Sequence, residues 1–369
     1  MRVLQVSSAK DLGGGERHFC DLSKGLARKG LDVTALIRSD CSWFEKLNGS
    51  NEGITVRQTL GISTGIGEVR AIISNAKDSG ADIIHAHLAR DYTRASIAAR
   101  FTGTKLVLTR HLMFPVSLRT RVLLGNVSGI IAVSSAVEEV LRAGFRGTRI
   151  VPIPNGIDVK RFSQADRPAL SSRFRREFQV PDHVKLITTV GELTTLKGQE
   201  DFVLAASELR KTSPDLFFVI VGRDNSRDRS YKRKLRRLVK VLGLDDHTLF
   251  LDWVEDTASL LSAADVFVSA SHTESYGLAI LEAMASGTPV VATRTDGAKE
   301  LLKSGVSGLF AEIGDPVSIA SAVDSLLKDP AGARELAAKA QTEAAERFSI
   351  ERMIDETAGF YDEVLSASG

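Results

Sequence analysis

Short segments rich in β-branched residues alternate with amphipathic, helix-like stretches along almost the whole chain. This alternation is typical of parallel sheets, in which helices cross over between neighbouring strands. The sequence therefore predicts the α/β class. In the first half, the predicted strands are residues 3–6, 33–37, 83–86, 105–109 and 129–133, and residues 135–141 form one of the predicted helices.

The series of strands is interrupted near the middle of the chain. Residues 151–158 contain two prolines and an Asn-Gly pair, which end regular structure, and residues 166–176 are polar and rich in arginine. Because 369 residues exceed what one hydrophobic core usually supports, we expect two similar domains, 1–163 and 180–349, joined by a linker region at 164–179. A cleft between them is the expected ligand site. The second series has strands at 185–190, 216–221, 248–251, 266–269 and 289–292, helices at 199–210 and 231–242, and helical periodicity over 329–365.

Composition excludes several classes of protein. Apolar residues make up 43% and charged residues 25%, which is typical of globular domains rather than disordered chains. The 48 basic and 46 acidic residues give a net charge of +2, so no overall attraction to nucleic acid or anionic membranes is expected. No uncharged run is long enough for a membrane span, and no secretory signal is visible. Cys20 and Cys41 lack the spacing of zinc ligands, so we expect free thiols in a reducing cytoplasm.

Three glycines, Gly13, Gly14 and Gly15, follow the first predicted strand and open a helix-like stretch. Glycines at a helix N-terminus let backbone amides approach an anion or a sugar closely. A nicotinamide-binding fingerprint would place its glycines directly after the strand and an acid at the end of the second strand, where this chain has Arg38. A nicotinamide site is therefore disfavoured, and a flexible turn is the remaining alternative to a binding loop.

The segment from Ser271 to Thr293 combines several features of a phosphate-binding loop. A predicted strand leads into a loop that holds Glu274, and a helix is expected to begin near Gly277, where the first-turn amides can bond phosphate oxygens. Glu282 lies inside that helix, where its carboxylate can accept two hydrogen bonds from a vicinal diol. An exposed glutamate on a helix surface is the alternative interpretation.

This segment resembles the fingerprint of the retaining GT-B glycosyltransferases of family four, glycosyl transferases group one. The matching residues are Glu274 and the run Glu282-Ala-Met-Ala-Ser-Gly-Thr-Pro-Val-Val-Ala-Thr293. The resemblance extends along the chain through residues 13–15, 109–111, 153–158 and 190–198. It implies the GT-B fold, in which two Rossmann-like domains face a central cleft. The N-terminal domain would bind the acceptor, the C-terminal domain would bind the nucleotide sugar, and residues 350–369 would form a last helix that joins the N-terminal domain.

The resemblance also implies roles for individual residues. Glu282 would hold the ribose hydroxyls, Glu274 would contact the donor sugar, and Lys197 would pair with the diphosphate, where fixed positive charge stabilises the leaving group. The alternatives are a solvated lysine at 197 and a structural histidine at 111. The implied catalytic residues are His111, Lys197 and Glu274, and the implied donor-binding residues are Gly14, Gly15, Lys197, Glu274, Tyr276, Gly277, Leu278, Glu282, Arg223 and Arg294.

The chain departs from the family pattern at two places. Gly191-Glu192-Leu193 stands where many members have Gly-Arg-Leu, so an arginine that helps to hold the diphosphate is absent. Arg223 and Arg294 both follow predicted strand ends, and either could supply the missing charge. Asp296-Gly297 replaces a Gly-Gly pair, which we interpret as a harmless variant of a turn.

No metal or other cofactor is expected. The chain contains no Asp-x-Asp pair, the motif that holds a divalent ion in the other main glycosyltransferase fold. His85 and His87 point to the same side of their strand, because side chains alternate with period two. Without a third ligand in register they are interpreted as structural, with a metal site as the alternative.

Residues 223–237 contain eight Lys or Arg and two Asp. Helical periodicity places Leu235, Leu238, Val239 and Leu242 on one apolar stripe and the basic residues opposite. We interpret the basic side as a solvated surface, with a patch for anionic lipid or polysaccharide as the alternative. Nucleic acid is not an expected partner, because the stretch lacks an aromatic platform for bases.

The sequence thus predicts a retaining, metal-independent hexosyltransferase of polysaccharide biosynthesis. Its donor would be a nucleoside diphosphate sugar, with UDP sugars favoured over GDP-mannose, and its acceptor a lipid-linked or cell-envelope glycan. The expected location is the cytoplasm, with peripheral contact at the inner membrane face as an option. The alternative functions are a non-catalytic anion or nucleic-acid binding protein and a nucleotide-sugar epimerase on the same fold.

Overall fold

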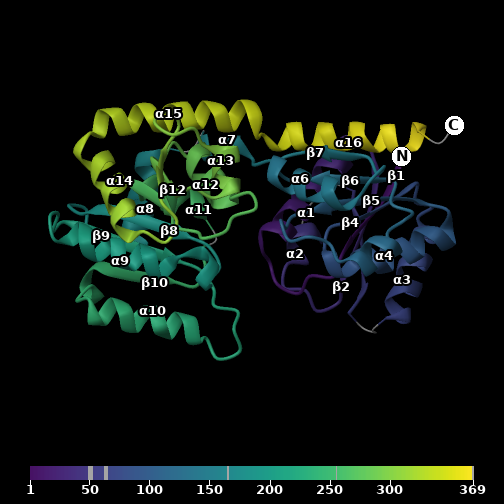
Figure 1. Cartoon of the computed structure of the whole chain (residues 1–369), viewed down its shortest axis with the longest axis horizontal. Helices are drawn as coiled ribbons and strands as arrows, with labels where there is room; N and C mark the ends of the chain where they lie inside the picture. The colour runs from purple at the N-terminus through teal and green to yellow at the C-terminus, as the bar shows by residue number, and fades with distance from the viewer. Residues whose placement is uncertain (49–52, 62–64, 164–165, 255, 368–369) are drawn as a thin grey trace. The chain divides into compact units, whose positions relative to one another are not determined.

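The computed structural model describes residues 1–48, 53–61, 65–163, 166–254 and 256–367. The chain forms two compact units, the first made of Met1–Gly156 with Ile350–Gly369 and the second of Ile157–Ser349 (Figure 1). Each unit is a parallel sheet with helices connecting its strands. The predicted α/β class with two Rossmann-like sheets is therefore confirmed.

The sheet of the first unit has seven parallel strands in the order β3-β2-β1-β4-β5-β6-β7. β1 pairs with β2 on one side and with β4 on the other, so the strand order reverses next to β1. The inner strands are buried almost end to end, which explains why most of their residues are apolar. The strands are β1 (Arg2–Ser7), β2 (Asp32–Arg38), β3 (Thr55–Leu60), β4 (Ile83–Ala86), β5 (Lys105–Arg110), β6 (Gly129–Ala132) and β7 (Ile150–Pro152).

Helices connect these strands, and side-chain caps fix where several of them begin. Glu16 Oε2 accepts a hydrogen bond from the Gly13 amide at the start of α1, and Ser134 Oγ accepts one from the Val137 amide at the start of α6. The helices are α1 (Gly14–Arg28), α2 (Glu45–Asn48), α3 (Ile66–Asp78), α4 (Ala89–Thr102), α5 (Leu118–Leu123) and α6 (Ser135–Gly144). Cys20 and Cys41 are free thiols, and burial raises the pKa of Cys20 to about 12.

The last helix, α16 (Ile350–Ser366), belongs to the first unit although it is far from the rest of that unit in sequence (Figure 1). Its Phe360, Tyr361 and Val364 lie in one buried cluster with Leu22 and Leu26 of α1. The Lys29–Asp355 ion pair, at 2.5 Å between Nζ and Oδ1, adds a surface contact between the two segments.

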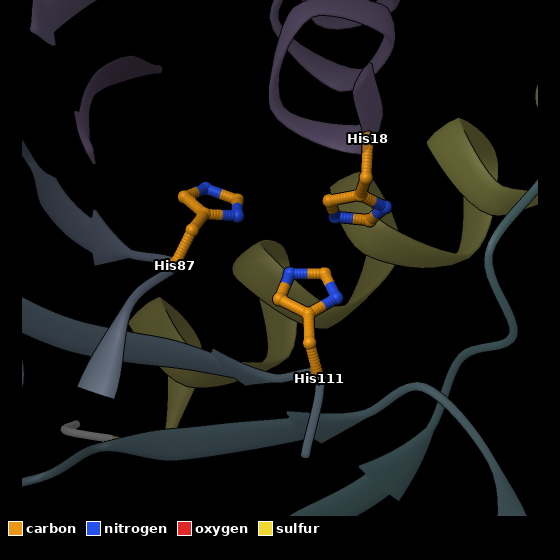
Figure 2. Close-up of side chains that lie close together, drawn as sticks. All are labelled: His18, His87 and His111. Carbon is orange, nitrogen blue, oxygen red and sulfur yellow. The ribbon is translucent and has the colours of Figure 1, made fainter. Parts of the chain in front are cut away.

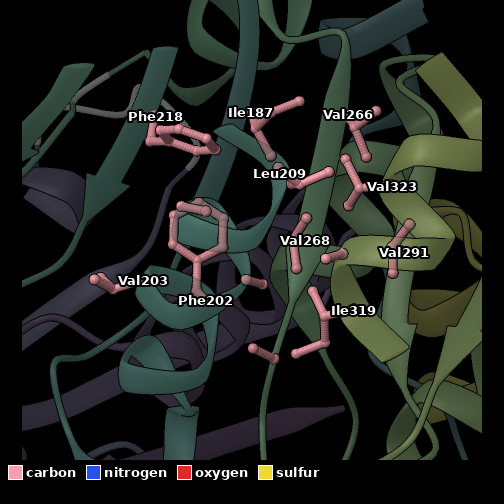
Figure 3. Close-up of a cluster of buried hydrophobic side chains, with 14 of the residues drawn as sticks. Ile187, Phe202, Val203, Leu209, Phe218, Val266, Val268, Val291, Ile319 and Val323 are labelled. Atoms are coloured by element: carbon pink, nitrogen blue, oxygen red, sulfur yellow. The ribbon is translucent and has the colours of Figure 1, made fainter. Parts of the chain in front are cut away.

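The second unit has a six-stranded parallel sheet in the order β10-β9-β8-β11-β12-β13. Its core joins the sheet to α9 and α14, with Phe202 of α9 and Ile319 of α14 packed around Val268 of β11 (Figure 3). The strands are β8 (Lys185–Val190), β9 (Leu216–Val221), β10 (Thr248–Leu251), β11 (Val266–Ser269), β12 (Val290–Thr293) and β13 (Leu309–Ala311). The helices are α7 (Val159–Ser163), α8 (Arg167–Glu177), η1 (Thr195–Lys197), α9 (Gln199–Arg210), α10 (Ser230–Val241), η2 (Asp245–His247), α11 (Thr257–Ala263), α12 (Leu278–Ala285), α13 (Asp296–Leu301), α14 (Pro316–Lys328) and α15 (Pro330–Arg347).

Three strands, β3, β7 and β13, were not predicted from the sequence. All three lie at sheet edges. An edge strand pairs on one side only and is less buried, so its sequence need not be a continuous apolar run. In β3, for example, only Leu60 is buried. We expected regular structure to end at residues 151–158. This prediction is wrong for the first two of these residues, because β7 continues to Pro152.

The segment expected to be a linker, residues 164–179, also differs from the prediction. Residues 167–177 form α8, which Asp166 caps by accepting a hydrogen bond from the Ala169 amide. Phe174 is fully buried against residues such as Leu260 of α11. The arginines of α8 make its sequence polar, and one of them, Arg167, donates hydrogen bonds to the backbone oxygens of Ser286 and Gly287. The division between the units falls instead at Gly156 and Ile157.

Candidate active site

The carboxyl ends of β8 and β11 lie next to each other in the middle of the second sheet. The strand order reverses between them, and ligands of open parallel sheets bind outside the strands at such a point. η1 follows β8 and carries Lys197, and the loop after β11 carries Glu274. Lys197 Nζ and Glu274 Oε2 form an ion pair at 2.6 Å. The structure therefore brings these two predicted site residues together.

Gly198 makes this close approach of two loops possible. Its φ of +63° lies in the left-handed region, and a β carbon there would be 1.9 Å from the carbonyl oxygen of Ala270. The same two loops are joined by a hydrogen bond of 2.8 Å from the His272 amide to the Leu196 oxygen. A residue with a side chain at 198 would push Lys197 away from the loop that holds Glu274.

The Lys197–Glu274 pair is only partly covered. The side chain of Lys197 is 31% exposed and that of Glu274 is 15% exposed. Ser271 Oγ lies 3.4 Å from the same carboxylate oxygen and donates to it. A lysine so placed can exchange its carboxylate partner for an incoming anion, because both groups remain accessible from solvent.

Helix α12 begins directly after this loop. Gly277 precedes it with a φ of +102°, which favours glycine, and Leu278 is its first residue. The first-turn amides of α12 are therefore next in sequence to the Glu274 loop, as expected for an anion site at a helix N-terminus. Tyr276 is buried, with its ring centroid 6.3 Å from that of Phe348.

Glu282 is buried in α12, with 4% of its surface exposed. The alternative interpretation of an exposed helix glutamate is therefore wrong. The N-terminus of the helix that carries this carboxylate borders the Lys197–Glu274 loop.

The residues around the missing arginine are engaged elsewhere. Glu192 Oε1 accepts a hydrogen bond of 3.0 Å from Asn225 Nδ2. The Arg223 guanidinium lies 4.8 Å from the ring centroid of Trp253. Arg294 Nε donates to Glu312 Oε1 at 2.8 Å. These contacts of the two arginines give no reason to prefer one of them as the substitute.

Acidic neighbours neutralise much of the basic segment. On α10, Lys232 pairs with Asp252, and Lys234 pairs with Glu200 at 2.7 Å. On the apolar stripe, Leu235 is buried and Leu238 is packed against the core. These ion pairs favour the solvated-surface interpretation over a patch for polyanions.

In the first unit, the predicted glycine loop lies beside the predicted histidine. Gly14 is the first residue of α1, and a β carbon on Gly15 would lie 3.8 Å from Cδ2 of His111. Burial raises the pKa of Glu16, which caps this helix. The loop and His111 are 96 residues or more apart in the sequence, but they lie side by side in the structure.

His111 lies in a cluster with His18 and His87 (Figure 2). One ligand atom from each ring lies within 4.8 Å of the other two. The ring centroids of His18 and His111 are 4.9 Å apart, and those of His18 and His87 are 5.6 Å apart. Burial lowers the pKa of His111 to about 4, helped by the charge of Arg110, and burial also lowers the pKa values of His18 and His87.

A fourth histidine, His85, belongs to a hydrogen-bonded structural network next to this cluster. Its Nδ1 lies 2.6 Å from the hydroxyl of Tyr361 on α16, and its Nε2 lies 2.7 Å from Oγ1 of Thr109. Its ring centroid is 4.1 Å from that of His87, so the two do share one side of the sheet. The structural interpretation fits His85, whereas His87 has a free ring edge in the cluster.

The sequence reasoning missed His18. It lies in α1, one turn after the glycine loop, and belongs to no recognisable motif. The sequence did contain a signal for the other two histidines. His87 and His111 both follow strands, and the carboxyl ends of adjacent parallel strands meet at one edge of a sheet. The pairing of β4 with β5, which makes these two ends adjacent, was not evident from the sequence.

Within the described part of the chain, no helix is both long enough and apolar enough to span a bilayer.

Two family models match the chain. Glycosyltransferase Family 4 matches residues 12–161, and Glycosyl transferases group 1 matches residues 171–347. The D-inositol 3-phosphate glycosyltransferase of Geodermatophilus obscurus is 29% identical, over 99% of this chain and 89% of that protein. The lipopolysaccharide core biosynthesis glycosyltransferase LpsE of Rhizobium meliloti is 26% identical, over 96% of this chain and 97% of that protein.

Solved structures with the same fold cover the whole chain. Anabaena HepE in complex with UDP-glucose has a TM-score of 0.88 at 24% identity, over 98% of this chain and 100% of that one. A glycosyltransferase from Rickettsia africae has a TM-score of 0.89 at 22% identity, over 100% and 99% of the two chains. The two parallel-sheet units of this chain are thus those of the GT-B fold.

Proposed function

The chain is a glycosyltransferase of group 1, and we propose that it transfers a hexose from a nucleoside diphosphate sugar with retention of configuration. The observation that carries this proposal is the Lys197–Glu274 pair, which lies at the strand-order reversal of the second sheet and borders the N-terminus of α12. Positive charge and the first-turn amides of a helix at one place suit a diphosphate.

The proposed mechanism assigns one task to each of these groups. Lys197 and the first-turn amides after Gly277 bind the diphosphate and stabilise the negative charge that develops as the sugar bond breaks. Released from Lys197, Glu274 accepts hydrogen bonds from the sugar hydroxyls. Glu282 accepts hydrogen bonds from the ribose diol. In the first unit, His111 and the loop of Gly14 and Gly15 bind near the sugar and the acceptor.

We propose a UDP sugar as the donor and a lipid-linked or cell-envelope glycan as the acceptor. The complex of HepE with UDP-glucose supports the donor, and the lipopolysaccharide core role in the name of LpsE supports the acceptor class. The D-inositol 3-phosphate glycosyltransferase name shows that similar chains also act on small acceptors. A soluble acceptor is therefore the second candidate. Peripheral contact with the cytoplasmic membrane face is part of the proposal for a lipid-linked acceptor.

A donor screen tests this proposal. The purified protein is mixed with UDP-glucose, UDP-N-acetylglucosamine, UDP-galactose or GDP-mannose, and its thermal unfolding is recorded. A donor at a hundred times its dissociation constant adds about 2.7 kcal/mol of apparent stability. We expect a UDP sugar to raise the melting temperature of the wild type, and Glu282→Gln to fold normally but lose most of this shift. A larger shift with GDP-mannose would refute the UDP preference, and an unchanged shift in Glu282→Gln would remove Glu282 from the donor site.

The proposal includes transfer without a divalent ion at the diphosphate. Lys197 and the α12 amides supply the positive charge that a metal provides in other glycosyltransferases. We therefore expect excess EDTA to leave the rate of transfer unchanged. A loss of activity that Mg²⁺ or Mn²⁺ restores would contradict the assigned diphosphate site. Retention is tested on the product, whose anomeric configuration is read by proton NMR and should equal that of the donor.

A further inference from the structure

The imidazoles of His18, His87 and His111 face one another in the first unit (Figure 2). His18 and His87 are buried and His111 is half-buried. Among the described residues, His87 Nδ1 and His111 Nε2 have no hydrogen-bond partner. Both ring nitrogens of His18 are buried as well, and the side chain of Asn155 favours the charged form of this ring. Buried polar atoms usually have partners, so this arrangement calls for an explanation.

The tautomer of His87 is fixed by its neighbours. Gln5 Nε2 donates to the hydroxyl of Tyr361 at 3.1 Å, which directs the amide oxygen of Gln5 toward His87. That oxygen lies 2.6 Å from His87 Nε2 and can only accept. His87 therefore carries its hydrogen on Nε2, and its Nδ1 presents a lone pair to the other two rings. A histidine whose second nitrogen donates to a fixed oxygen is the usual arrangement of a metal ligand.

We propose that His18, His87 and His111 bind one late first-row divalent cation of the Zn²⁺ type. Imidazole nitrogen suits Zn²⁺, Co²⁺, Ni²⁺ and Cu²⁺, whereas the three ligands include no oxygen of the kind that Mg²⁺ and Ca²⁺ prefer. One cation would provide a partner for every buried lone pair in the cluster.

The geometry requires only small adjustments. A zinc ion at about 2.0–2.1 Å from each of three tetrahedral ligands holds their nitrogens about 3.4 Å apart. The nitrogens of this cluster lie within 4.8 Å of one another, so rotations of the imidazoles close the site. Three protein ligands leave a fourth position open, as in zinc sites that exchange a water or a substrate atom. Gly15, which has no side chain, lies beside His111 and leaves room there.

This cation takes no part in the proposed transfer reaction, which proceeds without a divalent ion. If His111 also acts near the donor sugar, a cation on its Nε2 blocks that role, and Zn²⁺ inhibits transfer. This consequence rests on the proposed function. The binding of the cation does not, so a binding experiment distinguishes a failure of one from a failure of the other.

The experiment titrates the full chain, free of any histidine tag and stripped with EDTA, with Co²⁺ and then with Zn²⁺. For the wild type we expect one Co²⁺ per chain, with the visible absorption of a site of low coordination number, and displacement by one Zn²⁺. His18→Ala should weaken binding by more than about tenfold. Gln5→Ala should weaken it roughly 10- to 100-fold through the loss of the oxygen that orients His87. His183→Ala, at an exposed position in the second unit, serves as the control and should bind like the wild type.

Circular dichroism and thermal unfolding confirm that each variant is folded. If His18→Ala does not fold, His111→Ala at the half-buried position decides in its place. The absence of stoichiometric binding by the wild type would overturn the proposal. Undiminished binding by folded His18→Ala, or by folded His111→Ala where the first variant fails to fold, would overturn it equally.

Discussion

At the scale of single residues, the Lys197–Glu274 ion pair neutralises the charges of both side chains. Each charge has the other as its partner, at 2.6 Å. An isolated buried charge would be costly, whereas a pair that opens for a diphosphate only exchanges one anion for another. The proposed donor therefore competes with Glu274 for Lys197, and the carboxylate released in this way becomes available to the sugar.

The first prediction concerns this lysine. If its ammonium stabilises the departing diphosphate, Lys197→Ala should lower kcat roughly 10²- to 10³-fold, the effect of removing one donor from a developing oxyanion. The measurement is steady-state transfer at saturating donor. Lys211→Ala is the matched control, since Lys211 pairs with Glu208 on the exposed surface at 2.7 Å and should retain full activity. A kcat for Lys197→Ala within a few-fold of the wild type would remove the lysine from the mechanism.

A second residue-scale prediction concerns Glu192, which replaces the arginine of the family pattern. Its carboxylate is bonded to Asn225 rather than to a base. Glu192→Ala should therefore change kcat and the donor KM only mildly. The same assay on Arg223→Ala and Arg294→Ala identifies the arginine that compensates, by a raised donor KM. Wild-type behaviour of both arginine variants together with an inactive Glu192→Ala would show that Glu192 acts directly in catalysis.

At the scale of elements, the short segment η1 can approach the end of β11 closely because residue 198 is a glycine. In Gly198→Ala the new β carbon would meet the Ala270 oxygen, so the loop must move, and we expect both lower stability and lower kcat. Gly243→Ala separates the two causes. Gly243 has nearly the same φ, +65°, but nothing within 4 Å of a β carbon, so this variant measures the backbone strain alone, about 1–2 kcal/mol.

Urea unfolding of both variants gives the comparison. The loss of stability in Gly198→Ala should exceed that in Gly243→Ala, and kcat should fall only in Gly198→Ala. If both variants lost the same free energy of unfolding, the contact with Ala270 would not contribute to stability, and other contacts would place η1.

The elements also show what the sequence could predict. Strands in the middle of a sheet, such as β9, are rich in apolar residues because both faces are buried, and their bounds follow from the sequence. Edge strands such as β3 are half exposed, and α8 is polar because its arginines bond to backbone oxygens. The sequences of β3 and α8 are too similar to loop sequences to be assigned as a strand and a helix from the local pattern alone.

Some residues of the candidate site could also be predicted from the sequence, and others could not. Lys197 and Glu274 follow strands whose ends were visible in the sequence, and the family resemblance pointed to both. The cluster around His111 depends on which strands are neighbours in the sheet and on a helix that carries no motif. Those are properties of the tertiary structure, so the position of His18 beside His87 could not be derived from spacing.

At the scale of the whole molecule, one residue of the last helix makes buried hydrogen bonds to two strands of the first unit. The hydroxyl of Tyr361 contacts both His85 Nδ1 and Gln5 Nε2. Tyr361→Phe leaves these two buried groups without that partner, which should cost about 1–3 kcal/mol. Hydrogen exchange measures the effect and should show lower protection in β1 and α16, with the second unit unchanged.

A matched variant tests the other unit. Phe174→Leu, in the buried cluster of α8, should lower protection in the second unit and leave β1 and α16 as in the wild type. If Tyr361→Phe weakened both units equally, the two would unfold as one cooperative body rather than as separate cores.

The assignment of α16 to the first unit has a consequence for synthesis. The ribosome makes β1 to β7 first, then the entire second unit, and only then the helix that covers Leu22 and Leu26. At about 5–20 residues per second, the second unit takes roughly 10 to 40 seconds to emerge. Until α16 is made, the older half of the nascent chain presents an uncovered apolar surface, even after the younger half has all of its strands. The domain that is begun first is therefore the one that is finished last.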